Sequence, residues 1–421
     1  MPLLIPETVP AAIDHPDMRR AGRELLSLAL MDARNHTLHL LGEYEQSLVT
    51  TAQDIPERAE LELPAWLGGH IAWLAEYWIG RNPRHRLGGA CPSDAPRLAS
   101  IEPMADRWFD PALAPHGERW QLQLPDLAAV KAYLLDTLES TLELLDKTAE
   151  DDAGLHFFRA ALFHEDLRGE QLLTMAQTLA LPFKLALPSG SQQREALQVP
   201  AGRWTLGSAS GGYVFDLEQW AHDIDVPAFE IDAQPVNWAQ YVEFVDDGGY
   251  DRMELWLPEG WRWLQREASH DGRRGPRYVE QIGAASGAVL QTRFGKPTRM
   301  AGNQSAMHLT WWEAEAWTRW AGRRLPTELE WEMAARVATR RGFRWGDVRE
   351  WTAGTLRPWP GFMPDAWTRG TTLEAQPQFG SARVLRGASF ATRARMKHPK
   401  FRSFALPERD DGFVGFRSCA L

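Results

Sequence analysis

The chain has 421 residues, more than a single domain usually contains, so two or three domains are expected. Its formal net charge of −10 gives no long-range attraction to a polyanion, which argues against nucleic acid as a partner. No apolar run approaches a membrane span, and the N-terminal segment lacks the basic and apolar regions of a signal peptide. We therefore expect a cytoplasmic protein with no membrane partner. Cys91 and Cys419, the only cysteines, lie too far apart to indicate a disulfide framework.

The first part of the chain predicts a helical bundle. Apolar residues recur at helical spacing in four segments, which are joined by loops and cover residues 18–53, 64–80, 125–147 and 154–180. Pro125 and Asp126 stand where a helix begins. Four such helices with intervening loops favour a four-helix bundle. The Pro, Gly and Arg-rich segment 81–124 is expected to be mostly loop.

The composition changes at residues 187–198, "LPSGSQQREALQ", which have the polar character of a linker. Beyond it, short β-like runs such as "YVFDL" and "ARVLRGASF" alternate with loops rich in Gly, Pro and Trp. Helices are expected at 310–322 and, after a Thr327/Glu330 capping box, at 327–338. The fold class predicted is therefore α+β, with a helical bundle over 1–186, a linker over 187–198 and a second domain over 199–421.

Two histidines lie on the predicted helices. His70 shares a helical face with Trp73 and Tyr77, and His164 shares a face with Arg168 four residues later. A histidine on an apolar helix is more often a hydrogen-bonded core residue than a metal ligand, and Arg168 could equally form an ion pair with a carboxylate such as Glu165. These residues alone leave both readings open.

The second half resembles the formylglycine-generating-enzyme superfamily, which has a C-type-lectin-like fold. The resemblance rests on ordered segments of the chain, namely "VPAGRWTLGS", "WWEAEAWTRWAGRRLPTELEWEMAAR", "WGDVREWTAG", "RVLRGASFAT" and "GFVGFRSC". Members that oxidise a protein cysteine need two nearby thiols for copper, and this half has Cys419 alone. "PGF" at 360–362 and "FRSFALPERDD" at 401–411 instead resemble the subgroup in which this domain follows a DinB-like bundle. That subgroup comprises the ergothioneine-type sulfoxide synthases and the selenoneine synthases.

The bundle fits the same subgroup, because "WLGGHIAWLAEYW" is similar to its first-ligand helix and "HEDLRGE" stands in place of its motif H-x-x-x-H-x-E. The resemblance implies a non-haem Fe(II) held by three histidines, with O₂ as co-substrate. His70 and His164 take two of the ligand places, and Arg168 takes the third. A guanidinium has no lone pair to donate, and Glu170 points about 240° away from His164 around the helix. The iron site then has two protein ligands and water, is completed from elsewhere, or is lost.

The resemblance also implies the substrates. Hercynine, the trimethylated betaine of histidine, is expected to lie between the domains, with Ser403 and Phe404 at its betaine end. His116 and Arg119 stand where related enzymes bind the carboxylates of a thiol donor, but His116 replaces an arginine. The active-site tyrosine of the family is missing, which leaves Trp367 as the nearest aromatic residue. These departures favour a donor with few carboxylates, such as a selenosugar. A thiol donor, or a hercynine-binding protein without metal, remains an alternative.

Overall fold

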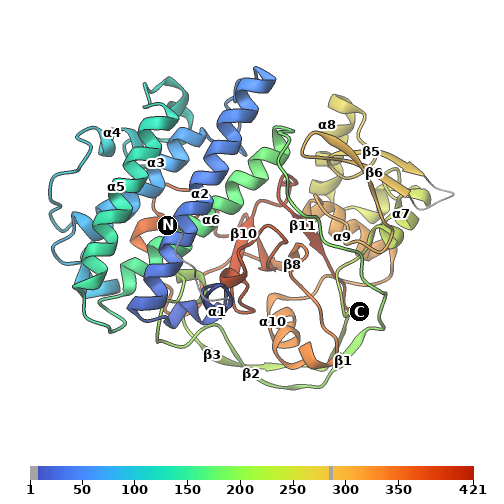
Figure 1. Cartoon of the computed structure of the whole chain (residues 1–421). Coiled ribbons are helices and arrows are strands. Elements are labelled where there is room, and N and C mark those ends of the chain that lie inside the picture. The colour runs from blue at the N-terminus through green and yellow to red at the C-terminus, as the bar shows by residue number, and fades with distance from the viewer. Residues whose placement is uncertain (1–7, 284–287) are drawn as a thin grey trace.

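The computed structural model describes residues 8–283 and 288–421. A helical N-terminal half lies beside an α+β C-terminal half, with the α6 helix against the central sheet (Figure 1). No helix among the described residues is long and apolar enough to cross a membrane.

The N-terminal half is built around four long helices in the described part of the chain. They are α2 (Arg23–Thr51), α3 (Pro64–Ala75), α5 (Leu127–Asp146) and α6 (His156–Thr178). Helices α2 and α3 each pack against both α5 and α6, as expected of a bundle. Asp126 caps α5 by accepting a hydrogen bond from the backbone of Ala129, and a π-helical turn, Glu76–Gly80, extends α3. The segment between α3 and α5 is mostly loop, interrupted by α4 (Ala105–Phe109) and short 3₁₀ turns.

One glycine allows a close approach that matters for the site. A Cβ atom on Gly69 would overlap the ring of Phe109, so only glycine lets Phe109 pack against α3 here. This approach brings the carbonyl oxygen of Phe109 within 2.9 Å of His70 Nδ1. The sequence "GGH" in α3 therefore builds the environment of His70.

The C-terminal half contains a four-stranded sheet in the order β10–β9–β8–β11, in which β8 and β11 are parallel and the other pairs antiparallel. Its strands are β8 (Arg349–Thr355), β9 (Arg383–Gly387), β10 (Arg402–Ala405) and β11 (Val414–Phe416). Two small two-stranded sheets pair β1 (Leu197–Val199) with β4 (Phe229–Ile231) and β2 (Gly202–Leu206) with β3 (His222–Val226). The predicted helices are α9 (Trp311–Trp320) and α10 (Glu328–Val337), and the Thr327/Glu330 capping box forms as expected.

Three features of this half differ from the sequence-based expectation. The run "YVFDL" at 213–217 is loop and 3₁₀ turn, because Tyr213 and Phe215 pack into the interface with the bundle. Two helices were not predicted, α7 (Trp238–Asp246) and α8 (Pro258–Asp271), although α7 has an Asn237/Gln240 capping box and α8 begins with proline. A three-stranded sheet of β5 (Val279–Gly283), β6 (Ala288–Arg293) and β7 (Lys296–Met300) lies beside them.

The two halves share a core. One cluster of buried apolar residues includes Phe163 of α6 together with Phe215, Phe401 and Phe413 of the C-terminal half. A buried ion pair joins Arg395 to Asp166 of α6 at 2.7 Å. The polar linker runs along the side of the C-terminal half to β1, which takes up the last two residues of the predicted linker range (Figure 1). The halves are thus held together by buried contacts rather than tethered by a linker alone.

Candidate functional site

Two buried histidines face each other inside the bundle. His70 of α3 and His164 of α6 have their ring centroids 5.1 Å apart, with the ring planes at 76°. Both side chains are almost completely buried. Burial, followed by the positive charge of Arg168, lowers the pKa of both imidazoles well below the usual 6.5. Both rings are therefore neutral at physiological pH, which is the form that binds metals.

His70 is oriented as a metal-binding histidine usually is. Its Nδ1 lies 2.9 Å from the Phe109 carbonyl oxygen, which accepts a hydrogen bond from Nδ1–H, so the lone pair of the neutral ring is on Nε2. Within the described part of the chain, Nε2 has no hydrogen-bond partner. Trp66 stacks on one side of the ring at 4.7 Å between centroids and Trp73 lies at 5.6 Å. The indoles fix the ring while Nε2 stays free.

His164 differs in its hydrogen bonding. Its Nε2 accepts a hydrogen bond from Arg168 Nε at 3.1 Å, so the proton of the neutral ring is on Nδ1. That Nδ1 has no partner among the described residues. The spacing of four residues on α6 brings the two side chains together, as the sequence predicted. Arg168 thus occupies the lone pair that His164 would offer to a metal.

Arg168 is buried and has no carboxylate partner among the described residues. Its Nη1 donates to Gln171 Oε1 at 2.8 Å and to Thr372 Oγ1 of the C-terminal half at 3.2 Å. Its Nη2 is buried and makes no hydrogen bond to any described residue. Burial lowers the pKa of Arg168 to about 10, and Glu62 opposes the effect through its negative charge. The residue remains cationic at neutral pH, and its free Nη2 can bind a ligand oxygen. It is not the surface ion pair considered as an alternative.

A cavity of about 350 Å³ lies between α6 and the central sheet. Arg168 lines it from the bundle, and Ser403 and Phe404 line it from β10. Ser403 Oγ is buried and unpaired in the described part of the structure. The predicted substrate residues Ser403 and Phe404 therefore share one cavity with Arg168.

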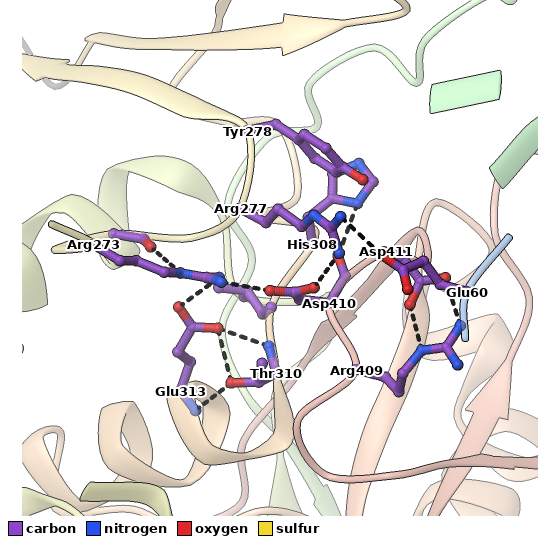
Figure 2. A network of polar contacts seen from close by, with 12 residues as sticks. Glu60, Arg273, Arg277, Tyr278, His308, Thr310, Glu313, Arg409, Asp410 and Asp411 are labelled. Carbon is purple, nitrogen blue, oxygen red and sulfur yellow. Dashed lines mark hydrogen bonds and ion pairs between the residues drawn. The ribbon is translucent and has the colours of Figure 1, made fainter. Parts of the chain in front are cut away.

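The other arginines of this cavity already have acidic partners. Arg349 forms a bidentate pair with Glu170 of α6 at 3.0 and 2.6 Å, and Arg409 forms one with Asp411 at 2.6 and 2.8 Å. Figure 2 shows how Arg409 and Asp411 belong to a larger network in which Arg273 and Arg277 both bind Asp410. Among the arginines that line the cavity, only Arg168 lacks a carboxylate partner in the described residues. It is the cation available to a bound molecule.

Trp367 lies on the other side of the histidines. Its ring is edge-on to His164 at 5.6 Å, and it comes from a 3₁₀ turn, Ala366–Thr368, of the C-terminal half. With Trp73 and Tyr77 of the bundle it lines a second cavity of about 500 Å³. The histidine pair is thus bordered by Arg168 toward the first cavity and by two indoles toward the second.

The predicted donor residues lie outside both cavities. The ring of His116 is 2.8 Å from the Leu61 carbonyl oxygen. Arg119 is buried, forms an ion pair with Glu62 and stacks on Trp66 at 3.4 Å from the ring centroid. Because Trp66 in turn stacks on His70, Arg119 supports the histidine pair from behind. In this structure its guanidinium is occupied by protein groups.

Comparison with known proteins shows the family to which the chain belongs. The sulfatase-modifying factor enzyme 1-like domain matches residues 183–347 and 343–420. Hercynine oxygenase of Mycolicibacterium smegmatis is 31% identical over 94% of this chain and 98% of its own length, and that of Mycobacterium tuberculosis is 30% identical over 94% and 98%. The chain belongs to the hercynine oxygenase family. Formylglycine-generating enzyme of Streptomyces coelicolor is 28% identical over 54% of this chain and 89% of its own, which covers the shared domain.

The residues around the two histidines meet some of the requirements of a metal site. His70 Nε2 is buried, unpartnered and carries a lone pair, as a ligand nitrogen must. His164 can offer Nε2 only when Arg168 moves. Among the described residues, no group of three or more His, Cys, Asp or Glu side chains is arranged to hold a metal ion. The two imidazoles are thus the candidate metal ligands at this position.

Several residues that shape the site were not predicted. Gln171 lies three positions after Arg168, a spacing that could have indicated the contact. Thr372 and Glu62 reach the site only through tertiary packing, so no local pattern points to them. Glu170 faces Arg349 and the hydroxyls of Ser389 and Thr392, in agreement with the expectation that it points away from His164.

Proposed function

We propose that the protein joins hercynine to a selenosugar by oxidative C–Se bond formation, with O₂ as the oxidant and Fe(II) as the metal. The observation that supports this most strongly is the pair of buried, facing histidines beside a cavity that Arg168 and Phe404 line together. His70 and, once released, His164 would hold the iron, whose chemistry when bound is the activation of O₂. Trp367, whose ring is edge-on to His164, would take the place of the missing tyrosine of the family.

The acceptor is assigned to the part of the cavity near β10. Phe404 lines this part of the cavity and also packs against an apolar cluster that includes Val384, and a trimethylammonium group that reaches its ring would be attracted to the aromatic face. Ser403 is the preceding residue of β10, and its hydroxyl, which has no partner among the described residues, can donate to the hercynine carboxylate. The family resemblance supports the same assignment of these two residues to the betaine end of hercynine.

The donor is assigned to the part of the cavity near Arg168. A donor with several carboxylates needs several free guanidinium groups, but Arg349 and Arg409 are paired and Arg119 is bound to Glu62. Arg168 alone supplies one free Nη2, and Gln171, Thr174, Thr372 and Gln378 supply neutral polar groups. Such a lining suits the hydroxyl groups of a sugar.

The test is a comparison of donors. The protein is incubated with Fe(II), O₂ and hercynine and separately with a selenosugar, the matching thiosugar, cysteine and γ-glutamylcysteine, and the products are identified by mass. We expect a hercynine–selenosugar adduct, with at least tenfold less product from cysteine and γ-glutamylcysteine. Preferential use of a thiol would instead make the protein an ergothioneine-type sulfoxide synthase. Hercynine binding without any product would indicate a non-catalytic binding protein.

A further inference from the structure

Arg168 makes an unusual set of contacts for a buried guanidinium. Buried arginines normally pair with carboxylates, because an isolated buried charge is unfavourable. Arg168 instead donates to a neutral imidazole, an amide and a hydroxyl, and one of its NH₂ groups is left without a partner in the described residues. The positive charge of Arg168 is therefore not neutralised by its contacts, and an anionic or oxygen-rich ligand in the cavity could bind the guanidinium.

The position of Arg168 also determines what His164 can do. The imidazole has a single lone pair in its neutral form, and Arg168 Nε occupies it at 3.1 Å. A metal and Arg168 cannot share that nitrogen, and the positive charge repels a dication as well. His70 Nε2, in contrast, has no hydrogen-bond partner in the part of the chain that the structure describes. The structure therefore shows one nitrogen prepared for a metal and one that is blocked.

We infer that Arg168 reversibly blocks the metal-binding nitrogen of His164, an arrangement that we call the lock. While the cavity is empty, the Arg168 guanidinium donates to the imidazole lone pair. A donor molecule that binds this guanidinium in the cavity draws it away and leaves His164 Nε2 available to the metal. This inference rests on the proposed function, since it assumes that His164 binds a metal when free. By thermodynamic linkage, donor and metal must then strengthen each other's binding by the same factor. The arrangement would delay assembly of the complete metal site until the donor is bound.

The first test needs no metal. In the apoprotein with ¹⁵N-labelled histidine, the His164 signals, assigned by their loss in His164→Gln, should show protonated Nδ1 and unprotonated Nε2. Saturating methyl β-D-glucopyranoside or S-methylcysteine, two probes without a free thiol, should shift the Nε2 signal of His164 as its hydrogen bond is lost. An Nε2-protonated His164 in the empty protein, or signals unchanged by both probes, would overturn the lock. Because no turnover is measured, these outcomes leave the proposed reaction untouched.

The second test measures anaerobic Fe(II) affinity by calorimetry. Arg168→Met removes the donor and the charge, and we expect it to bind Fe(II) about tenfold more tightly than the wild type. The probe that shifts the His164 signal in the first test should raise the Fe(II) affinity of the wild type about fivefold or more. It should have no such effect in Arg168→Met. Arg383→Met, which removes a guanidinium of β9 away from the cavity, is the matched control and should behave like the wild type.

The melting temperature of each variant would show whether it is folded. If Arg168→Met does not fold, Arg168→Lys provides the same comparison, because lysine keeps the charge but lacks the Nε–H group. We expect its Fe(II) affinity to rise about threefold, less than on loss of the charge. Equal Fe(II) affinities in the wild type and in the folded Arg168 variant would contradict the inference. If the wild type forms product although its Fe(II) affinity equals that of the Arg168 variant, the lock is refuted but the proposed function is not.

Discussion

At the scale of single residues, the site depends on which nitrogen of each histidine is free. His70 donates a hydrogen bond from Nδ1–H to the Phe109 carbonyl oxygen, whereas His164 accepts a hydrogen bond at Nε2 from Arg168, so two chemically identical side chains offer different groups. Sequence spacing was enough to predict that His164 and Arg168 share a face. It could not predict the direction of their hydrogen bond or the pairing of Arg119 with Glu62, since these depend on segments that meet only in the folded chain.

The aromatic face of Phe404 provides a prediction about the acceptor. Phe404→Leu keeps an apolar side chain of similar size but removes the ring, and should weaken hercynine binding by roughly 0.5 to 2 kcal/mol. Histidine, whose small ammonium group is strongly hydrated, should bind the wild type more weakly and lose little affinity in the variant. Calorimetry with both ligands measures this difference. An equal loss for hercynine and histidine would show that Phe404 acts by packing alone.

At the scale of elements, α6 carries most of the site on different faces. His164 and Arg168 face α3 and the first cavity, whereas Asp166 and Glu170 bind Arg395 and Arg349 of the C-terminal half. The position and length of α6 followed from its helical periodicity. The residues that pair with α6 could not be predicted in the same way, because Asp166 and Glu170 would be equally compatible with a solvent-exposed helix face.

Glu170 is expected to stabilise the fold without binding the metal. Although burial opposes ionisation, Arg349 and the hydroxyls of Thr392 and Ser389 lower the pKa of Glu170. Glu170→Ala leaves the largely buried Arg349 side chain without its partner and should reduce the free energy of unfolding in urea denaturation, by at most about 3 to 5 kcal/mol. Glu170→Gln, which keeps the hydrogen-bonding shape, should cost less and leave Fe(II) affinity unchanged. Loss of Fe(II) binding in a folded Glu170→Gln protein would instead make Glu170 a ligand.

The first residue of α6 makes the stability sensitive to acid. Burial, followed by the charge of Arg159, lowers the pKa of His156 to about 4 from 6.5. Between pH 6.5 and 4 the unfolded chain binds a proton at this residue that the folded chain does not, so stability falls as the pH falls. The contribution is at most about 1.4 kcal/mol per pH unit in that range.

Removal of the imidazole should remove this pH dependence. His156→Phe keeps a ring against Phe157 and Tyr213, and its free energy of unfolding should decrease less steeply than that of the wild type from pH 6.5 to pH 4.5. Above pH 7 the slopes of the two proteins should agree. Parallel curves over the whole range would mean that His156 is protonated in the folded protein as readily as in the unfolded chain.

At the scale of the whole molecule, the site exists only because the two halves are packed together. The bundle supplies His70, His164 and Arg168, and the C-terminal half supplies Phe404, Trp367 and the Thr372 hydroxyl that holds Arg168. The change in composition at the linker predicted the two halves, and the family resemblance predicted that they meet. The hydrophobic core that runs through both halves could not be predicted from the sequence of either half, because the contacting surfaces are formed by residues that come together only in the folded chain.

The central claim is that His70 and His164 form a metal centre rather than a polar pair in a packed core. The iron content of anaerobically purified protein, loaded with Fe(II) in the presence of the donor probe that releases His164, tests it most directly, with His85→Ala as the control. His85 resembles His70 in being buried, with Nδ1 near a carbonyl oxygen and Nε2 unpartnered among the described residues, but it is not paired with a second histidine in the site. We predict close to one iron per chain in the wild type and in His85→Ala, and almost none in His70→Ala or His164→Ala. Equal iron contents in all four proteins, or none in the wild type, would contradict the account.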